Sequence, residues 1–108
     1  MRIGCPTEIK TREYRVGMTP ATCREAVAHG HEVLVHRGAG LGAGFADAAY
    51  EAAGARLADT AEEIFATAGL IVKVKEPQPI ERGMLRVEQT LFTYLHLAPD
   101  PEQTRDLL

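Results

Sequence analysis

Three side chains with complementary chemistry follow three segments that read as β-strands. Arg15 follows Arg2–Cys5, Lys75 closes Leu70–Val74, and His96 follows Thr90–Leu95. In an open parallel α/β sheet, small-molecule sites form beyond the carboxyl ends of the strands. A guanidinium, an amine and an imidazole brought together at that edge predict a pocket for a small carboxylic acid.

Each of these three residues also has a plainer interpretation. Arg15 fits a solvated loop arginine, but its planar guanidinium also gives a carboxylate two parallel hydrogen bonds, which lysine cannot. Lys75 fits a surface residue at a strand end, and Lys73 on the same strand is expected to snorkel to solvent. His96 fits a core histidine, although an imidazole is well suited to proton transfer near neutral pH.

The elements that must position these residues alternate along the chain. Five strands are predicted, at Arg2–Cys5, His31–His36, Ala55–Ala58, Leu70–Val74 and Thr90–Leu95. Helical sequence separates them, so the pattern predicts βαβ units with right-handed crossovers. The expected fold is α/β, with a doubly wound, mostly parallel sheet of the flavodoxin or Rossmann-like kind.

Local signals set the expected helix boundaries. Thr19 should cap a helix that begins at Pro20 and stops at Gly30, where glycine supplies a left-handed residue. Asp47 should cap a short helix that ends at Gly54. Thr60 and Glu63 form a capping-box pattern before the next helix. A short helical turn is expected around Ile80–Leu85, and a final helix from Asp100.

A glycine-rich segment raises the alternative of a nucleotide site. Gly38–Ala43 satisfies the pattern G-x-G-x-x-G/A. The dinucleotide motif, however, requires the helix to begin within the glycine loop, with its N-terminus facing the pyrophosphate. Here three further residues, 44–46, precede Asp47, and a carboxylate at that helix start would repel phosphate. The pattern therefore favours a tight loop over a nucleotide site.

The histidines and cysteines do not form a convincing reactive cluster. His31 and His36 would lie about 15 Å apart on an extended strand, which disfavours a metal site with His29. Cys5 and Cys23 are expected to act as small buried hydrophobic residues. A disulfide is disfavoured in a reducing compartment, and no base is evident that would activate a catalytic thiol.

Composition narrows the functional classes. The chain has 108 residues, a net charge of −3 and a pI near 5.8, without a basic stripe for nucleic acid. No apolar run has the length of a membrane span, and the N-terminus lacks a signal-peptide core, so a cytoplasmic location is expected. Leu107 and Leu108 fall inside the last expected helix, which suggests a chain truncated at its C-terminal end.

Several segments together resemble the N-terminal region of alanine dehydrogenases. They cover essentially the whole chain: Met1–Lys10, Glu13–Pro20, Gly30–Val35, Gly38–Gly42, Val72–Pro77 and Leu91–Ala98. The segments Lys73–Pro77 (Lys-Val-Lys-Glu-Pro) and Phe92–Leu97 (Phe-Thr-Tyr-Leu-His-Leu) are the most specific. The alpha subunit of proton-translocating nicotinamide nucleotide transhydrogenase shares this domain family but lacks the histidine, so His96 favours the dehydrogenase.

The resemblance implies a reaction and a set of roles. L-Alanine, water and NAD⁺ would be converted to pyruvate, ammonium and NADH, with His96 as the catalytic acid/base. Arg15, Lys75 and Tyr94 would bind the substrate. NAD would be held by a separate Rossmann domain absent from these residues, so the chain alone should be inactive, and the complete enzyme should form homo-oligomers such as hexamers.

Two alternatives to the dehydrogenase stay open. The first is the transhydrogenase alpha subunit, which would act with membrane-spanning partners. The second is a non-catalytic module that binds a small keto or amino acid.

Overall fold

A parallel five-stranded sheet forms the centre of the protein. The computed structural model describes residues 1–9, 15–74, 78–85 and 89–93. Its strand order is β3-β2-β1-β4-β5, and every neighbouring pair is parallel. The strands are β1 (Arg2–Cys5), β2 (Glu32–His36), β3 (Arg56–Ala58), β4 (Leu70–Val72) and β5 (Thr90–Phe92). This arrangement confirms the predicted doubly wound α/β fold.

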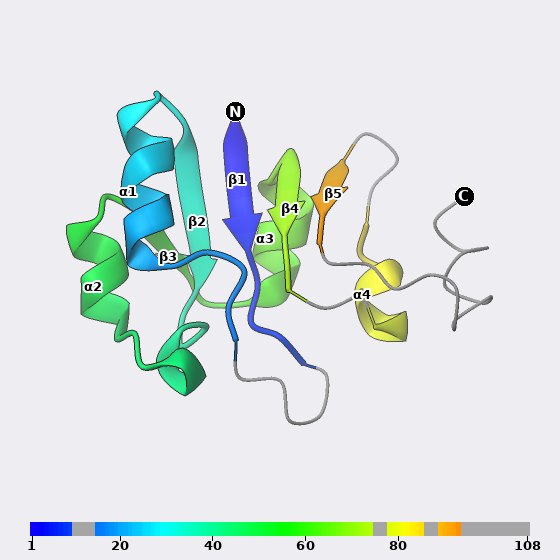
Figure 1. The fold of residues 1–108 in the computed structure, drawn as a ribbon. Helices are drawn as coiled ribbons and strands as arrows, with labels where there is room; N and C mark the ends of the chain where they lie inside the picture. The colour runs from blue at the N-terminus through cyan, green and yellow to red at the C-terminus, as the bar shows by residue number, and fades with distance from the viewer. Residues whose placement is uncertain (10–14, 75–77, 86–88, 94–108) are drawn as a thin grey trace.

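Helices cover both faces of this sheet. They are α1 (Pro20–Ala28), α2 (Asp47–Ala52), α3 (Ala61–Thr67) and α4 (Pro79–Arg82), with a 3₁₀ turn η1 at Leu41–Ala43. Helices α1 and α2 lie on one face and α3 on the other, as Figure 1 shows. The sheet is therefore the middle of three layers, with helices packed on both of its faces.

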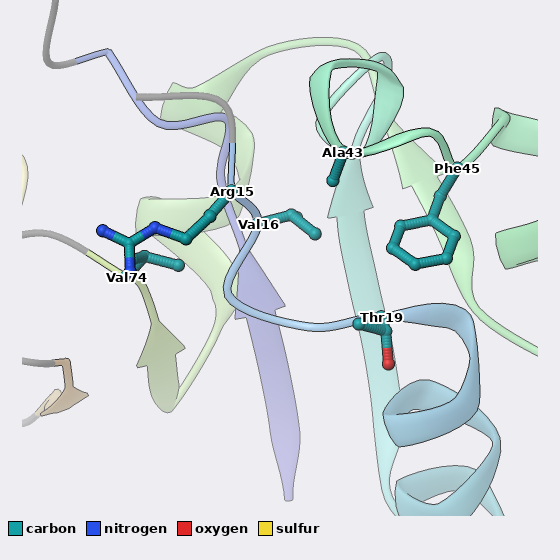
Figure 2. Close-up of a pocket in the computed structure, with 6 residues that line it drawn as sticks. All are labelled: Arg15, Val16, Thr19, Ala43, Phe45 and Val74. Atoms are coloured by element: carbon teal, nitrogen blue, oxygen red, sulfur yellow. The ribbon is translucent and has the colours of Figure 1, made fainter. Parts of the chain in front are cut away.

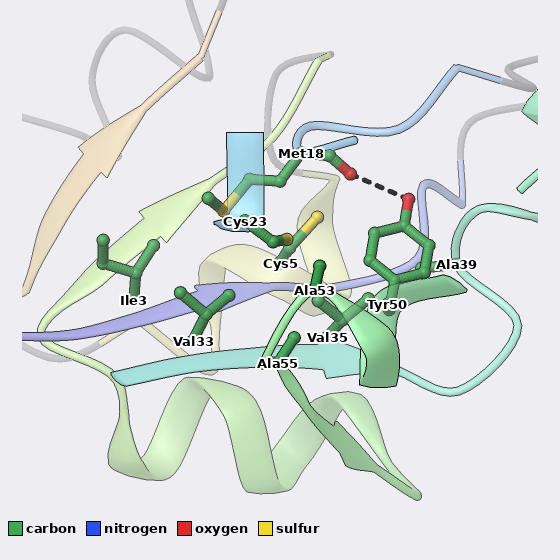
Figure 3. Close-up of a cluster of buried hydrophobic side chains, with 10 residues drawn as sticks. All are labelled: Ile3, Cys5, Met18, Cys23, Val33, Val35, Ala39, Tyr50, Ala53 and Ala55. Carbon is green, nitrogen blue, oxygen red and sulfur yellow. Dashed lines mark hydrogen bonds between the residues drawn. The ribbon is translucent and has the colours of Figure 1, made fainter. Parts of the chain in front are cut away.

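The two core clusters follow from the alternation of side chains along the strands. Ile3, Cys5, Val33 and Val35 point to the α1 and α2 face, where Tyr50 joins them (Figure 3). The intervening residue of β2, Leu34, points the other way and joins a second cluster. That second cluster also holds Ala58, Ile64, Phe65, Ala68 and Ile71. A period of two along each strand thus gives each helical layer its own apolar surface.

The predictions for β1 and α1 are confirmed. Strand β1 has the expected bounds, and Pro20 is the first residue of α1. The Thr19 hydroxyl accepts from the Thr22 amide at 3.2 Å, which satisfies one of the unpaired amides of the first turn. Gly30 has φ +87°, the left-handed conformation expected after the helix.

Two local predictions need correction, and a third is confirmed in part. Strand β4 ends at Val72 rather than Val74, although the Lys73 amide still donates to the Phe92 carbonyl at 3.0 Å. Asp47 is the first residue of α2 rather than its cap, because its carboxylate accepts from the Gly38 amide instead. At α3, Thr60 accepts from the Glu63 amide at 3.2 Å, so the half of the capping box made by Thr60 is confirmed.

Several predictions lie outside the described residues. They concern the end of the fifth strand at residues 94 and 95, the final helix from Asp100, and the three candidate site residues Lys75, Tyr94 and His96. In the described part of the chain, no helix has the length and apolar character needed to cross a membrane.

Candidate functional site

The strand order reverses direction between β1 and β4. From β1 the chain proceeds to β2 on one side, and it later returns to place β4 on the other side. In doubly wound sheets, ligands bind in the crevice beyond the carboxyl ends of the strands at this switch point. The segments that follow β1 and β4 are therefore where a small-molecule site is expected.

A cavity of about 350 Å³ lies at this position. It is lined by residues that follow β1, by one that follows β4 and by two from the glycine-rich loop: Arg15, Val16, Thr19, Val74, Ala43 and Phe45. The Arg15 side chain extends toward the Val74 side of the cavity, and Phe45 lies on the opposite side (Figure 2). Its volume is at the lower end of the range for ligand pockets, as a small molecule requires.

The lining residues suit a small carboxylic acid with a short apolar side chain. Arg15 supplies a fixed positive charge, and its side chain is exposed enough to meet a ligand. A guanidinium can bind both oxygens of a carboxylate through parallel hydrogen bonds. Val16, Phe45 and Val74 provide apolar contact beside it. The structure thus places Arg15 in the lining of a cavity beyond the carboxyl ends of the strands.

Tyr50 contacts two of the segments that line the cavity. Its hydroxyl donates to the Met18 carbonyl at 2.8 Å, and its ring meets that of Phe45 edge to face at a centroid distance of 6.5 Å. The loop approaches Tyr50 so closely at Gly40 that a Cβ there would lie 2.6 Å from the tyrosine ring. Gly40 therefore allows the loop to pack against Tyr50, beside Phe45 in the lining of the cavity.

The glycine-rich loop is organised against phosphate binding. The Gly38 amide, which a nucleotide phosphate would need, already donates to the Asp47 carboxylate at 2.8 Å. Helix α2, which follows, has six residues and begins with that same acidic group. A carboxylate at this position repels phosphate. The Gly38 amide is therefore directed to a carboxylate of the same chain.

The expectation that Lys73 snorkels to solvent is wrong. Its side chain is 1% exposed, and its ammonium lies 3.0 Å from a Glu8 oxygen and 2.9 Å from a Glu81 oxygen. Both carboxylates are 2% exposed. We call these three residues the Lys73 cluster. The ammonium can be buried because two carboxylates compensate its charge. Without them, taking the charge out of water would be too costly.

Sequence reasoning missed the Lys73 cluster because its members come from three separate segments. Glu8 is 65 residues from Lys73 in the sequence, and Glu81 belongs to α4. One signal was available, since a lysine in a strand covered on both faces needs a buried counter-charge. Nothing local to Lys73 identifies the residues that provide it.

The two thiols are poorly suited to act as nucleophiles. Both cysteines are free and buried, as the sequence predicted for small hydrophobic residues. Burial raises the pKa of Cys5 to about 12 and that of Cys23 to about 11. Because the thiolate is the nucleophilic form, neither residue is suited to covalent catalysis near neutral pH.

The three clustered histidines have separate partners. His29 Nδ1 lies 2.9 Å from the Glu25 carbonyl oxygen, and His36 Nδ1 accepts from the Thr7 amide at 3.3 Å. His31 Nδ1 lies 3.4 Å from the terminal amine of Met1. Among the described residues, no three histidine, cysteine or acidic side chains are grouped as a metal ion requires.

Comparison with known proteins gives a consistent result. The sequence model of the family described as alanine dehydrogenase/PNT, N-terminal domain, matches residues 4–108. An alanine dehydrogenase of Halomonas elongata is 54% identical over 108 residues, which are 100% of this chain and 29% of that protein. One of Mycobacterium tuberculosis is 51% identical over the same shares. The chain thus spans about 29% of the length of these relatives.

Solved structures agree with the sequence comparison. An L-alanine dehydrogenase structure superposes with a TM-score of 0.95 at 47% identity, over 99% of this chain and 29% of that one. A transhydrogenase from Sinorhizobium meliloti gives a TM-score of 0.93 at 28% identity, over 99% of this chain and 32% of that one. The first of these two is the more similar in both sequence and structure.

Proposed function

Because the chain belongs to the alanine dehydrogenase/PNT N-terminal domain family, we propose that it is the substrate-binding and catalytic portion of an alanine dehydrogenase. In the proposed reaction, L-alanine, water and NAD⁺ give pyruvate, ammonium, NADH and a proton. The observation that carries the proposal is the position of Arg15 in a small, partly apolar cavity at the switch point of the sheet.

In this proposal the residues of the chain divide the work on the substrate. Arg15 holds the carboxylate and so orients the α-carbon. Lys75 donates to the carbonyl oxygen of pyruvate or to the oxygen that develops on the way to it. His96 takes up and returns protons as water adds to the imine and ammonia leaves. Tyr94 lines the same pocket. Positioning and proton transfer are separable contributions, the second of them worth about 10²–10⁴-fold in rate.

NAD accepts the hydride in this reaction, and we place its site outside this chain. Our reason is that the glycine-rich loop directs its Gly38 amide to the Asp47 carboxylate, where a dinucleotide motif would direct it to a phosphate. The proposal therefore requires a separate dinucleotide-binding domain, without which the chain should not turn over substrate. It also includes assembly of the complete enzyme into homo-oligomers and a cytoplasmic location.

A chimera tests this proposal directly. This chain would replace the matching 108 residues of the Halomonas elongata relative, with which it is 54% identical. We expect the chimera to reduce NAD⁺ with L-alanine, and His96→Ala to abolish turnover while pyruvate still binds. A chimera that assembles like its parent but has no L-alanine-dependent activity would contradict the proposal, as would unchanged turnover in His96→Ala.

The transhydrogenase likeness defines the second candidate. It is favoured by the TM-score of 0.93, but the identity is 28% against 47% for the L-alanine dehydrogenase. A transhydrogenase subunit exchanges hydride between nicotinamide nucleotides and has no use for an amino-acid pocket. Pyruvate binding by the chimera that is lost in Arg15→Ala therefore favours the dehydrogenase over this alternative.

A further inference from the structure

The Lys73 cluster has no part in the proposed mechanism, yet it adjoins the proposed site. We propose that Glu8 is a positioning residue, which fixes the segment after β4 against the segment after β1 and so sets the spacing of the substrate-binding groups. This inference rests on the proposed function. It concerns residues that do not themselves contact the substrate.

The contacts of Glu8 carry the argument. One carboxylate oxygen accepts from the Lys73 ammonium at 3.0 Å, and the other accepts from the Val74 amide at 2.9 Å. Glu8 thus binds both the side chain and the backbone of the segment that follows β4. Val74 is itself a wall of the cavity that Arg15 lines. A substitution of Glu8 would therefore shift Val74 and change the lining of the cavity.

Glu81 supports the same cluster from the other side. One of its oxygens lies 2.9 Å from the Lys73 ammonium, and the other accepts from the Gln78 amide at 2.9 Å. The ammonium is in this way held between two carboxylates, each of which also holds a backbone amide. Lys73 is the common point to which the segment after β1, the segment after β4 and helix α4 are all attached.

The Lys73 cluster joins the two segments that lead to the proposed substrate-binding residues. Glu8 lies three residues beyond the end of β1, on the segment that continues to Arg15. Lys73 and Val74 follow β4, on the segment that continues to Lys75. In the proposed mechanism, Arg15 and Lys75 must contact opposite ends of one small molecule. A misplacement of about 1 Å between such groups can cost as much as about 10²-fold in rate.

Stability alone is a weak explanation for the cluster. The cluster places three ionisable side chains, each only 1–2% exposed, in the interior of the protein. Taking charges out of water is costly, and buried ion pairs can often be replaced by apolar side chains without loss of stability. Apolar residues could not reproduce the hydrogen bond that the Val74 amide donates to the Glu8 carboxylate.

The test uses the active chimera and a matched pair of substitutions. Glu8→Gln and Glu81→Gln each remove one buried carboxylate from Lys73, so their stabilities should fall together. Only Glu8→Gln disturbs the hydrogen bond from the Val74 amide. A glutamine side chain has one oxygen, whereas Glu8 uses one oxygen for Lys73 and the other for Val74. We expect Glu8→Gln to lower kcat/KM for pyruvate by about tenfold or more, with KM for NADH unchanged. Glu81→Gln should lose distinctly less.

A third variant separates positioning from folding. The substitution E8L/K73M/E81L replaces the cluster by apolar side chains, and we expect it to fold and assemble while kcat/KM for pyruvate falls as in Glu8→Gln. Full activity of this variant, or equal losses in Glu8→Gln and Glu81→Gln, would overturn the positioning role. An inactive parent chimera is a distinguishable result, which refutes the proposed function and with it this role of Glu8.

Discussion

Arg15 is the residue on which the account of substrate binding depends. It lines the cavity at the switch point, and its guanidinium differs from an amine in shape rather than in charge. Two parallel hydrogen bonds to a carboxylate fix the orientation of the acid, whereas a single point charge only attracts it. The role of Arg15 should therefore be sensitive even to replacement by lysine.

We predict that Arg15→Lys in the chimera lowers kcat/KM for pyruvate by about 10- to 100-fold, as expected for the loss of a charged hydrogen bond worth about 1.5–3 kcal/mol. The melting temperature should not change, because the side chain is exposed. Steady-state kinetics and thermal unfolding measure the two effects. The matched control is Arg37→Lys, at an exposed ion pair with Asp59, which should be silent in both. Equal kinetics in the two variants would contradict the role of Arg15.

The buried thiols predict how stability depends on pH. Their pKa values rise on folding from about 9 to about 12 for Cys5 and about 11 for Cys23. Above pH 9 the unfolded chain therefore loses these protons before the folded one. The free energy of unfolding should fall as the pH rises from 9 toward 11, by at most about 1.4 kcal/mol per pH unit for each thiol.

Urea unfolding of the chain at pH 8, 9 and 10 measures this dependence. Cys23→Ala removes one of the two titrations, so its stability should fall less steeply over the same range. A free energy of unfolding that stays constant from pH 8 to pH 10, or that rises, would show that the thiols are not buried as described.

At the level of single residues, the sequence was informative about Arg15 and misleading about Lys73. An arginine that follows a strand is visible as a candidate because its chemistry is carried by one side chain. The environment of Lys73 depends on Glu8 and Glu81, and no local pattern connects those three positions. Lys75, Tyr94 and His96 lie outside the described residues, so their roles stay predictions.

Helix ends show how local chemistry sets the bounds of the elements. Thr60 accepts from the Glu63 amide at the start of α3. Thr67, at the other end of the same helix, instead donates its hydroxyl to the Glu63 carbonyl. The same residue type thus has two different roles in one helix.

We predict that Thr60→Ala lowers the free energy of unfolding by about 1 kcal/mol, the usual effect of losing an N-cap. Thr67→Ala is the control and should change stability by less than about 0.5 kcal/mol, because no unpaired amide depends on it. Denaturant unfolding of both variants provides the comparison. If Thr67→Ala were the more damaging of the two, the capping role of Thr60 would be wrong.

The glycine-rich loop is an element defined by close packing. At Gly40 an added Cβ would lie 2.6 Å from the Tyr50 ring and 2.9 Å from the Phe45 Cβ. Gly40→Ala should therefore destabilise the protein by about 1–3 kcal/mol, as overpacking does. Gly83→Ala is the control, since the nearest atom to its Cβ would lie at 3.6 Å. Thermal unfolding distinguishes them, and a neutral Gly40→Ala would contradict the packing described.

Sequence patterns identified the described strands and α-helices but not the 3₁₀ turn η1, and they placed some ends wrongly. Thr19, Pro20 and Gly30 set α1 correctly because each has a strong local preference. Strand β4 was predicted two residues too long, since the apolar pattern continues through Val74 after the ladder has ended. Asp47 was misplaced by one position because its carboxylate bonds to the loop rather than to its own helix.

At the scale of the whole molecule, the order of the strands in the sheet determines where the site lies. The strand order β3-β2-β1-β4-β5 creates the switch point, and with it the place where residues from the β1, β2 and β4 loops meet. An alternation of strands and helices predicts a parallel sheet but not which strands are neighbours. The cavity and the Lys73 cluster both depend on that order, so both had to be observed.

A ligand-bound structure of the chimera tests the central claim most directly, namely that these residues form a pocket for one small acid. With pyruvate present, we predict the carboxylate within hydrogen-bond distance of both terminal nitrogens of Arg15, and Lys75 and His96 at the keto end. Pyruvate bound away from Arg15, or Lys75 and His96 directed away from the ligand, would contradict the account.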